Sequence, residues 1–148
     1  MIERKCSCEM GMHRAPLERY IIESGAVNRL PELLENYNKI YMVCDENTYR
    51  VLGERAEQIL KSVGKFSHKH IFKGDVLPDA RNIGDVLIHL NDPKADSDIF
   101  KYSPQPDFIL AVGSGVVNDV CRVVSYRLGL PYGIAGTAPS MDGYASAG

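Results

Sequence analysis

The sequence lacks the features that identify membrane, secreted and nucleic-acid-binding proteins. No apolar run approaches the roughly 20 residues of a membrane-spanning helix, and the opening Met-Ile-Glu-Arg-Lys is not a signal peptide. There is no basic patch or arginine-rich run, and the formal net charge is -2. We therefore expect a cytoplasmic protein with neither a membrane nor a nucleic acid as partner. Its 148 residues are enough for one domain with a hydrophobic core.

Cysteine and histidine are scarce, with four of each. Cys44 and Cys121 lie in apolar patterns and are expected to be reduced core residues. Cys6, Cys8 and His13 could contribute to a metal site, but their spacing lacks a fourth ligand and matches no standard zinc pattern. We therefore assign no metal ligand within this chain.

Strand and helix patterns alternate along the chain. Short strands are expected at residues 19–23, 39–44, 68–72, 108–112 and 132–135, and helices at 28–37, 49–63, 79–90 and 116–128. Residues 1–17 should be irregular, and the polar, proline-broken stretch 91–106 should form an excursion loop. Such alternation predicts an α/β fold over residues 1–148, Rossmann-like, with a mostly parallel sheet and helices on both faces.

Capping residues mark several of these helix ends. Asn28 and Asp79 are expected to cap helix starts, because their side chains can accept from free backbone amides. Gly64 and Gly129 follow two helical patterns and are expected at the helix ends.

Small and polar residues follow four of the predicted strands. Asp45 ends one strand, Gly74-Asp75 ends the next, and the remaining two end at Gly113-Ser114-Gly115 and Gly136-Thr137. Since ligands bind outside the carboxyl ends of parallel strands, these residues should converge on one binding edge. A solvated rim of loops would have a similar composition, so that interpretation stays open.

The turn Gly113-Ser114-Gly115 leads from a buried strand into a helix. Glycine permits a sharp bend, and the free amides at the helix start, around Gly115, Val116 and Val117, favour a phosphate or pyrophosphate. The pattern G-x-G-x-x-N ends at Asn118 and lacks the third glycine of the dinucleotide fingerprint. A tight turn without a ligand is therefore the alternative.

Three carboxylates are candidates for ligand contacts. Asp45 could accept from ribose hydroxyls and would repel a 2′-phosphate, which favours NAD over NADP; it could instead cap a helix, unless Asn47 or Thr48 does so. Asp119 lies in the first turn of its helix, where a pyrophosphate would repel its carboxylate. Any contact of Asp119 with a cofactor would therefore be on the nicotinamide side. Asp142 lies in a run of small, neutral residues and could hold a substrate hydroxyl, or serve only as a turn or cap residue.

At these residues the sequence resembles the glycerol-1-phosphate dehydrogenases. These belong to a superfamily with iron-dependent alcohol dehydrogenases, glycerol dehydrogenase and dehydroquinate synthase. The resemblance runs from about Arg19 to the end, and its matching strings are Asp45-Glu-Asn-Thr48, Gly113-Ser-Gly-Val-Val-Asn-Asp119 and Thr137-Ala-Pro-Ser-Met-Asp-Gly-Tyr-Ala-Ser146. The last string is the most specific to the glycerol-1-phosphate branch.

The resemblance implies hydride transfer between NAD(P)H and dihydroxyacetone phosphate, giving sn-glycerol 1-phosphate. By the same resemblance, Asp142 contacts substrate, Asp45 contacts the adenosine side, and the glycine turn contacts the pyrophosphate and nicotinamide. The cofactor contacts implied are Asp45, Gly113, Ser114, Gly115, Val116, Val117, Asn118, Asp119, Thr137, Ala138, Pro139, Ser140 and Ser146. A homo-oligomer is also expected.

In that family a divalent metal, such as zinc, nickel or iron, polarises the substrate carbonyl. Its ligands, one Asp and two His, lie in a helical C-terminal domain, and no histidine follows Asp142 here. We therefore expect this chain to be the N-terminal cofactor domain of a longer enzyme, inactive alone and prone to self-association. Two alternatives are another polyol or alcohol dehydrogenase of the superfamily and a non-catalytic nucleotide-binding α/β module.

Overall fold

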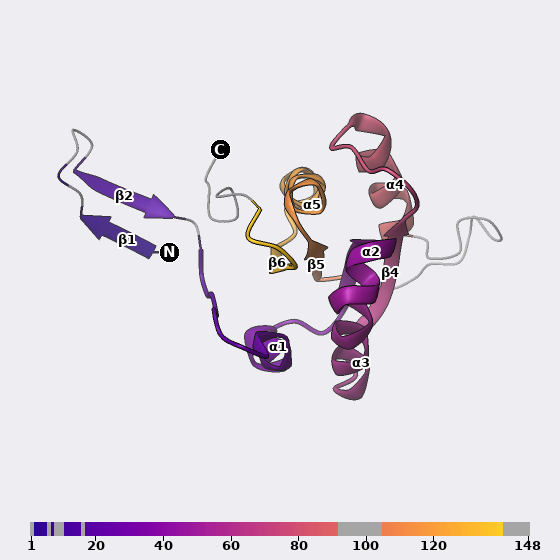
Figure 1. Ribbon diagram of the computed structural model, residues 1–148, viewed down its shortest axis with the longest axis horizontal. Coiled ribbons are helices and arrows are strands. Elements are labelled where there is room, and N and C mark those ends of the chain that lie inside the picture. Colours follow the sequence, from indigo (N-terminus) through magenta and orange to yellow (C-terminus); the bar gives the residue numbers. More distant parts are fainter. Residues whose placement is uncertain (1, 6, 8–10, 16, 92–104, 141–148) are drawn as a thin grey trace.

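A four-stranded parallel sheet forms the centre of the molecule (Figure 1). The computed structural model describes residues 2–5, 7, 11–15, 17–91 and 105–140. In spatial order the strands are β4 (Phe66–Phe72), β3 (Ile40–Asp45), β5 (Phe108–Gly113) and β6 (Tyr132–Gly136). Each neighbouring pair is parallel. The predicted α/β fold and four of the five predicted strands are thereby confirmed.

Helices cover both faces of this sheet. On one face, α4 (Ala80–Asn91) and α5 (Gly115–Leu128) pack over Tyr41, Val43 and Ile109. On the other face lie α1 (Leu30–Leu33) and a continuous helical stretch made of α2 (Glu46–Thr48), η2 (Tyr49–Gly53) and α3 (Glu54–Ser62). Strand residues alternate between the two cores because successive side chains of a strand point to opposite faces.

Three of the predicted helix caps are confirmed. The Asp79 carboxylate accepts a hydrogen bond from the backbone amide of Asn82, at 2.9 Å, in the first turn of α4. Gly64 (φ 70°) and Gly129 (φ 63°) adopt the left-handed conformation just after α3 and α5. That conformation is strained for residues with a Cβ, so glycine is the natural terminator at both points.

The N-terminal region differs from its prediction. Residues expected to be irregular form an antiparallel hairpin of β1 (Ile2–Lys5) and β2 (Met12–Ala15). The strand predicted at residues 19–23 is wrong: no strand pairs with this segment, and Ile22 is 91% exposed. The Arg19 guanidinium instead donates to the Glu35 carboxylate at 2.7 Å. A strand requires a neighbouring backbone edge, which the local apolar pattern does not supply.

Two predicted helices also need correction. The helix expected at residues 28–37 is a 3-10 turn, η1 (Ala26–Arg29), followed by the short α1. Asn28 does not cap it; its side-chain oxygen accepts from Arg55 at 3.0 Å. The helix expected to begin at Tyr49 begins at Glu46. Residues 49–53 form a wider π turn within this helical stretch.

The start of β5 is held by a contact between segments far apart in the sequence. The Asp107 carboxylate accepts hydrogen bonds from the backbone amides of Asn38 and Lys39, both at 2.8 Å. These bonds align the starts of β3 and β5. Of the predicted excursion loop, residues 92–104 lie outside the described residues.

Candidate functional site

The carboxyl ends of the four strands form one edge of the sheet. Asp45 at the end of β3 is in register with Phe72 of β4. One strand further, Cys44 pairs with Val112, so the next residue of β5, Gly113, lies beside Asp45. Gly113 in turn pairs with Gly136 of β6. The predicted convergence of Asp45, Gly113 and Gly136 on one edge is confirmed.

Between β3 and β5 the chain leaves the sheet in opposite directions. After β3 it crosses to β4 through α2, η2 and α3 on one face, and after β5 it crosses to β6 through α5 on the other. Two adjacent parallel strands with diverging connections leave a crevice outside their carboxyl ends, where α/β proteins bind ligands. Asp45 and the turn at Gly113 flank this crevice.

The glycine turn combines a tight strand–helix contact with an uncapped helix start. A Cβ added at Gly113 would lie 2.9 Å from both Cβ and Cγ2 of Val117, so only glycine fits there. Ser114 is the N-cap of α5 but its side chain makes no capping bond. The first amide with a helical partner is that of Asn118, which donates to the Ser114 carbonyl at 3.0 Å. The amides of Gly115, Val116 and Val117 therefore precede the helix ladder, at the positive end of α5.

The Asp45 carboxylate has one oxygen engaged in the fold. Its Oδ1 accepts from the backbone amides of Asn47 and Thr48, both at 2.8 Å, while the Thr48 hydroxyl accepts from the Asp45 amide at 3.0 Å. Asp45 itself therefore caps the helix, and neither Asn47 nor Thr48 replaces it. Among the described residues Oδ2 has no hydrogen-bond partner. Capping fixes the carboxylate and leaves an oxygen for a ligand, so the two predicted roles are compatible.

Asn118 and Asp119 have different environments at the start of α5. Asn118 is completely buried, and among the described residues neither its Oδ1 nor its Nδ2 has a hydrogen-bond partner. An unpaired buried polar group costs about 1–3 kcal/mol, so this amide fits a place that a ligand, water or further chain completes. The Asp119 side chain is partly exposed and accepts from Arg122 at 3.3 Å.

The loop after β6 lies against the glycine turn. The Thr137 amide donates to the Gly113 carbonyl at 3.0 Å, which joins the two loops at the rim of the crevice. Ala138, Pro139 and Ser140 continue from there and are exposed. The predicted contacts Asp142 and Ser146 lie outside the described residues, so their roles remain predictions.

Neither the cysteines nor the histidines form a metal centre among the residues that the structure describes. Within those residues no group of three or more His, Cys, Asp or Glu side chains could hold a metal ion. Cys6 and Cys8 fall outside them, and His13 lies in β2. Cys44 and Cys121 are buried free thiols, as predicted. Burial raises the pKa of the Cys44 thiol to about 12, and also raises that of Cys121, so both remain protonated at neutral pH.

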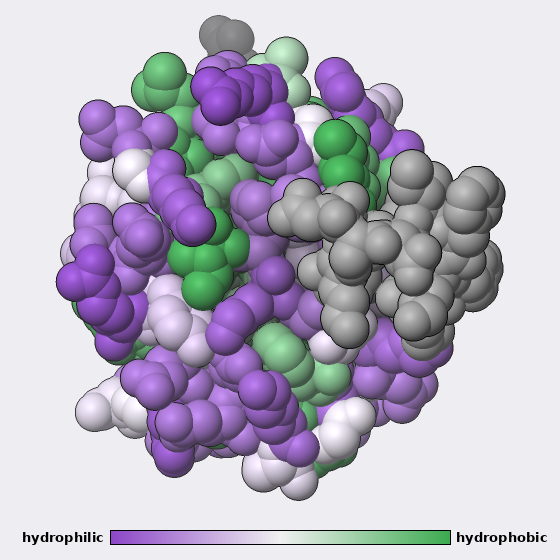
Figure 2. Space-filling model, turned by 90° about the vertical axis from the view of Figure 1, so that its right-hand side faces the viewer, coloured by the Kyte–Doolittle hydropathy of each residue, from purple (hydrophilic) through white to green (hydrophobic). Residues whose placement is uncertain are grey.

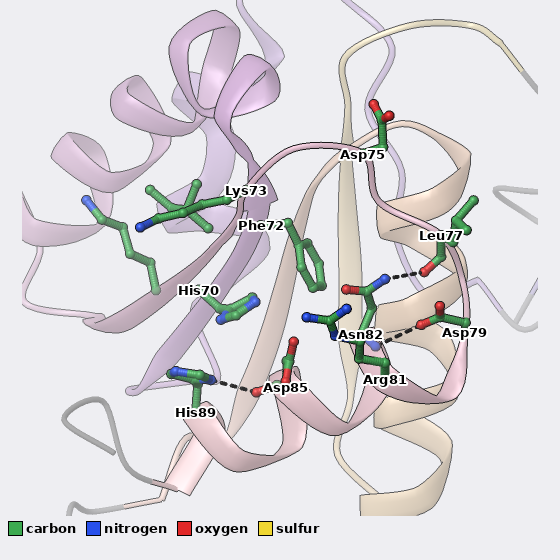
Figure 3. A pocket seen from close by; sticks show the side chains of 12 residues that line it. His70, Phe72, Lys73, Asp75, Leu77, Asp79, Arg81, Asn82, Asp85 and His89 are labelled. Atoms are coloured by element: carbon green, nitrogen blue, oxygen red, sulfur yellow. Dashed lines mark hydrogen bonds between the residues drawn. The ribbon is translucent and has the colours of Figure 1, made fainter. Parts of the chain in front are cut away.

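A hollow of about 610 Å³ opens beside β4, on the outer side of the sheet (Figure 3). The face on this side is mostly hydrophilic, with separate hydrophobic spots (Figure 2). The lining residues come from β4, the following loop and α4: Lys69, His70, Ile71, Phe72, Lys73, Asp75, Leu77, Asp79, Arg81, Asn82, Asp85 and His89. The sequence patterns did not single out this hollow, although the position of Lys73 directly after a strand could have drawn attention to it.

One basic residue of this lining, Lys69, already has partners within the fold. Its ammonium lies 2.5 Å from the Glu57 carboxylate and 2.9 Å from the Tyr49 hydroxyl, on the α3 side of the sheet. Burial would raise the pKa of Glu57, but hydrogen bonds from Lys61, Lys69 and Tyr49 lower it to about 2. Glu57 is therefore ionised at neutral pH, and its contacts with Lys69 and Tyr49 stabilise the fold. Because Lys69 is engaged in these contacts, Lys73 is the available basic side chain nearest the strand end.

The described part of the chain contains no helix that is both long and apolar enough to cross a membrane.

Comparison with known proteins assigns the chain to a family. Residues 21–148 match the family model described as iron-containing alcohol dehydrogenase. The chain is 33% identical to glycerol-1-phosphate dehydrogenase (NAD(P)+) of Halalkalibacterium halodurans, across 95% of this chain and 34% of that protein. It is also 33% identical to the Bacillus subtilis enzyme of the same name, across 89% of this chain and 32% of that protein. The chain thus spans about a third of the length of these relatives.

A solved structure agrees on the fold. Glycerol dehydrogenase from Schizosaccharomyces pombe superposes with a TM-score of 0.60 at 18% identity, covering 79% of this chain and 27% of that one.

Proposed function

Since the chain belongs to the iron-containing alcohol dehydrogenase family, we propose that it forms the NAD(P)-binding part of a glycerol-1-phosphate dehydrogenase. One observation carries this proposal. Asp45 lies at the end of β3, next to the uncapped turn Gly113-Ser114-Gly115 at the end of β5, and the crevice lies between them. An acidic side chain on one strand and free amides on the next are the two elements that α/β folds use for a ribose and a pyrophosphate.

Each side of the crevice has a separate task. The amides of Gly115, Val116 and Val117 donate to the pyrophosphate, which is stabilised by the positive end of α5. Oδ2 of Asp45 accepts from a ribose hydroxyl, while Oδ1 keeps the carboxylate oriented through the helix cap. The cofactor is bordered on the β6 side by Thr137, Ala138, Pro139 and Ser140. Asp119 lies toward the nicotinamide end of the cofactor.

The bound dinucleotide would supply or accept the hydride that interconverts dihydroxyacetone phosphate and sn-glycerol 1-phosphate. Asp142 is our proposed contact to the substrate, and Ser146 a further cofactor contact. The names of the curated relatives favour this substrate over other polyols or alcohols.

The described residues do not fit a metal ion, because they contain no cluster of ligands for one. We therefore assign them no step that involves the iron of the family description, or zinc or nickel in its place. The catalytic unit that we propose is the longer protein, acting as a homo-oligomer, and this chain alone is expected to bind the dinucleotide without turnover.

Calorimetric titration with NADH tests the cofactor assignment. Asp45→Asn is the informative variant, since asparagine caps helices as well as aspartate does but carries no charge. We expect its NADH affinity to fall about tenfold, because a charge-assisted hydrogen bond becomes a neutral one. Asp45→Ala removes the cap as well, so its melting temperature should also fall.

Two results would contradict the proposal: absence of NADH binding to the folded protein, or unchanged affinity in Asp45→Asn. The substrate is tested separately on the full-length gene product, by comparing dihydroxyacetone phosphate with dihydroxyacetone. Preference for the unphosphorylated ketone would contradict the glycerol-phosphate assignment and leave the cofactor assignment intact.

A further inference from the structure

Lys73 lies at the carboxyl end of β4, next to the cofactor edge. It follows Phe72, which is in register with Asp45 on the neighbouring strand. Adjacent strands are about 4.8 Å apart, so the backbone at Lys73 adjoins the start of α2, where the Asp45 carboxylate caps the helix. Lys73 was not among the residues predicted to contact the cofactor.

The side chain of Lys73 extends toward the α2 side of the sheet. Lys69, four residues earlier in the strand, contacts Tyr49 and Glu57 on that side, and side chains at even spacing share a face. Figure 3 shows Lys73 leaving the strand end on this side, whereas Arg81 points into the hollow toward His70. Lys73 is therefore a cation on the same side of the sheet as α2, one residue beyond the strand position in register with Asp45.

Lys73 is also not committed to another partner. It is exposed, and among the described residues it has no ion pair with a carboxylate. Three carboxylates belong to the neighbouring rim: Asp45, the exposed Glu46 and the exposed Asp75. Without a nearby cation, they would repel a phosphate group placed beyond the ribose.

We propose that Lys73 is the residue that lets this site accept a 2′-phosphate, so that NADP binds as well as NAD. The inference rests on the proposed dinucleotide site. It accounts for a conflict between the Asp45 carboxylate, which disfavours NADP, and the names of the relatives, which include both cofactors. The Lys73 ammonium makes a charge-assisted contact to the phosphate, and NAD has no group at that position.

The test is titration of wild type and Lys73→Gln with NADPH and with NADH. In Lys73→Gln the NADPH affinity should fall about tenfold, the loss of one charge-assisted hydrogen bond, with NADH affinity unchanged. Arg81→Gln is the matched control, since it removes the same charge from the same hollow, but on the other side. It should leave the ratio of the two affinities unchanged.

The possible outcomes separate this inference from the proposed function. If NADH binds and Lys73→Gln leaves the NADPH-to-NADH ratio unchanged, the role of Lys73 is wrong and the dinucleotide site stands. An equal effect of Arg81→Gln would show only a general effect of charge, and would also overturn it. If wild type binds neither nucleotide, the proposed function itself is wrong and this inference falls with it.

Discussion

Gly113 shows how one residue couples the fold to the candidate site. It ends β5, begins the glycine turn, and its carbonyl accepts from the Thr137 amide. The glycine is required by contact with Val117, not by its backbone angles, because Gly113 is not among the glycines with positive φ. The close approach of strand and helix brings the free amides of α5 to the edge of the sheet.

Gly113→Ala should therefore destabilise the protein by about 1–3 kcal/mol, the usual cost of forcing an atom into a packed core. Chemical unfolding measures the change. Gly84→Ala in α4 is the matched control, since a Cβ there meets nothing within 4 Å. In a helix that substitution should stabilise by up to about 1 kcal/mol. Equal effects of the two substitutions would contradict the packing argument.

At the scale of elements, β4 and α4 enclose histidines that are held neutral. His70 lies between the rings of Phe72 and His89, with centroids 4.5 and 4.8 Å away. The Nε2 of His68 donates a hydrogen bond to the His89 carbonyl at 2.9 Å. Burial, and then the neighbouring His89, lower the pKa of His70 to about 4, and burial also lowers the pKa of His68.

This arrangement predicts a loss of stability on mild acidification. In the unfolded chain His70 takes up a proton near pH 6.5, whereas in the folded protein it stays neutral until about pH 4. The stability is complete above pH 6.5 and decreases as the pH falls from there toward 4. Between pH 7.5 and 4.5 we expect His70 to account for about 1 kcal/mol, because the ring is partly solvated.

Urea unfolding of wild type and His70→Leu at several pH values measures this contribution. The carboxylates titrate in both proteins, so the difference between the two curves isolates His70. The charged residues Asp85 and Arg81 also line the hollow beside His70. They are present in both proteins, so their charges do not account for a difference between the two curves. Parallel curves for the two proteins would show that His70 contributes nothing.

At the scale of the whole molecule, the chain is a third of the length of its curated relatives. Among the described residues the buried amide of Asn118 lacks hydrogen-bond partners, as does the Nε2 of His70. Ser125, on the same helix, is also buried, but its hydroxyl donates to the Leu130 carbonyl. The two residues allow an unsatisfied and a satisfied polar group to be compared within one helix.

Asn118→Leu should stabilise this chain by about 1–2 kcal/mol, because an unpaired buried amide is replaced by an apolar side chain. Ser125→Ala should destabilise it by about 1 kcal/mol, because it leaves a carbonyl unpaired. Melting temperatures of both variants test this. A lower melting temperature for Asn118→Leu would mean that the amide has a partner, such as a bound water, in this chain by itself.

Much of the fold follows from local patterns in the sequence. Short apolar runs, such as Phe108 to Val112, mark the buried strands, because a strand that is covered on both faces has no exposed positions for polar residues. Asp79 and Gly129 mark helix ends for reasons that lie in their own side chains and backbone. The convergence of Asp45 with the glycine turn could also be predicted, since parallel strands bring their carboxyl ends to one edge.

Other features depended on contacts that no local pattern contains. The strand predicted at residues 19–23 is absent because no sheet edge pairs with it, and residues 49–53 form a π turn that the apolar spacing did not predict. By itself the sequence determined the four parallel strands, the helix ends at Asp79, Gly64 and Gly129, and the convergence of Asp45, Gly113 and Gly136 on one edge, because these depend on composition and order along the chain. Only the tertiary structure decided that Asn118 is buried without a hydrogen-bond partner among the described residues, and that Lys73 directly follows the strand residue in register with Asp45. Both results arise from the packing of separate segments, because the number of residues between two segments does not fix their distance in space.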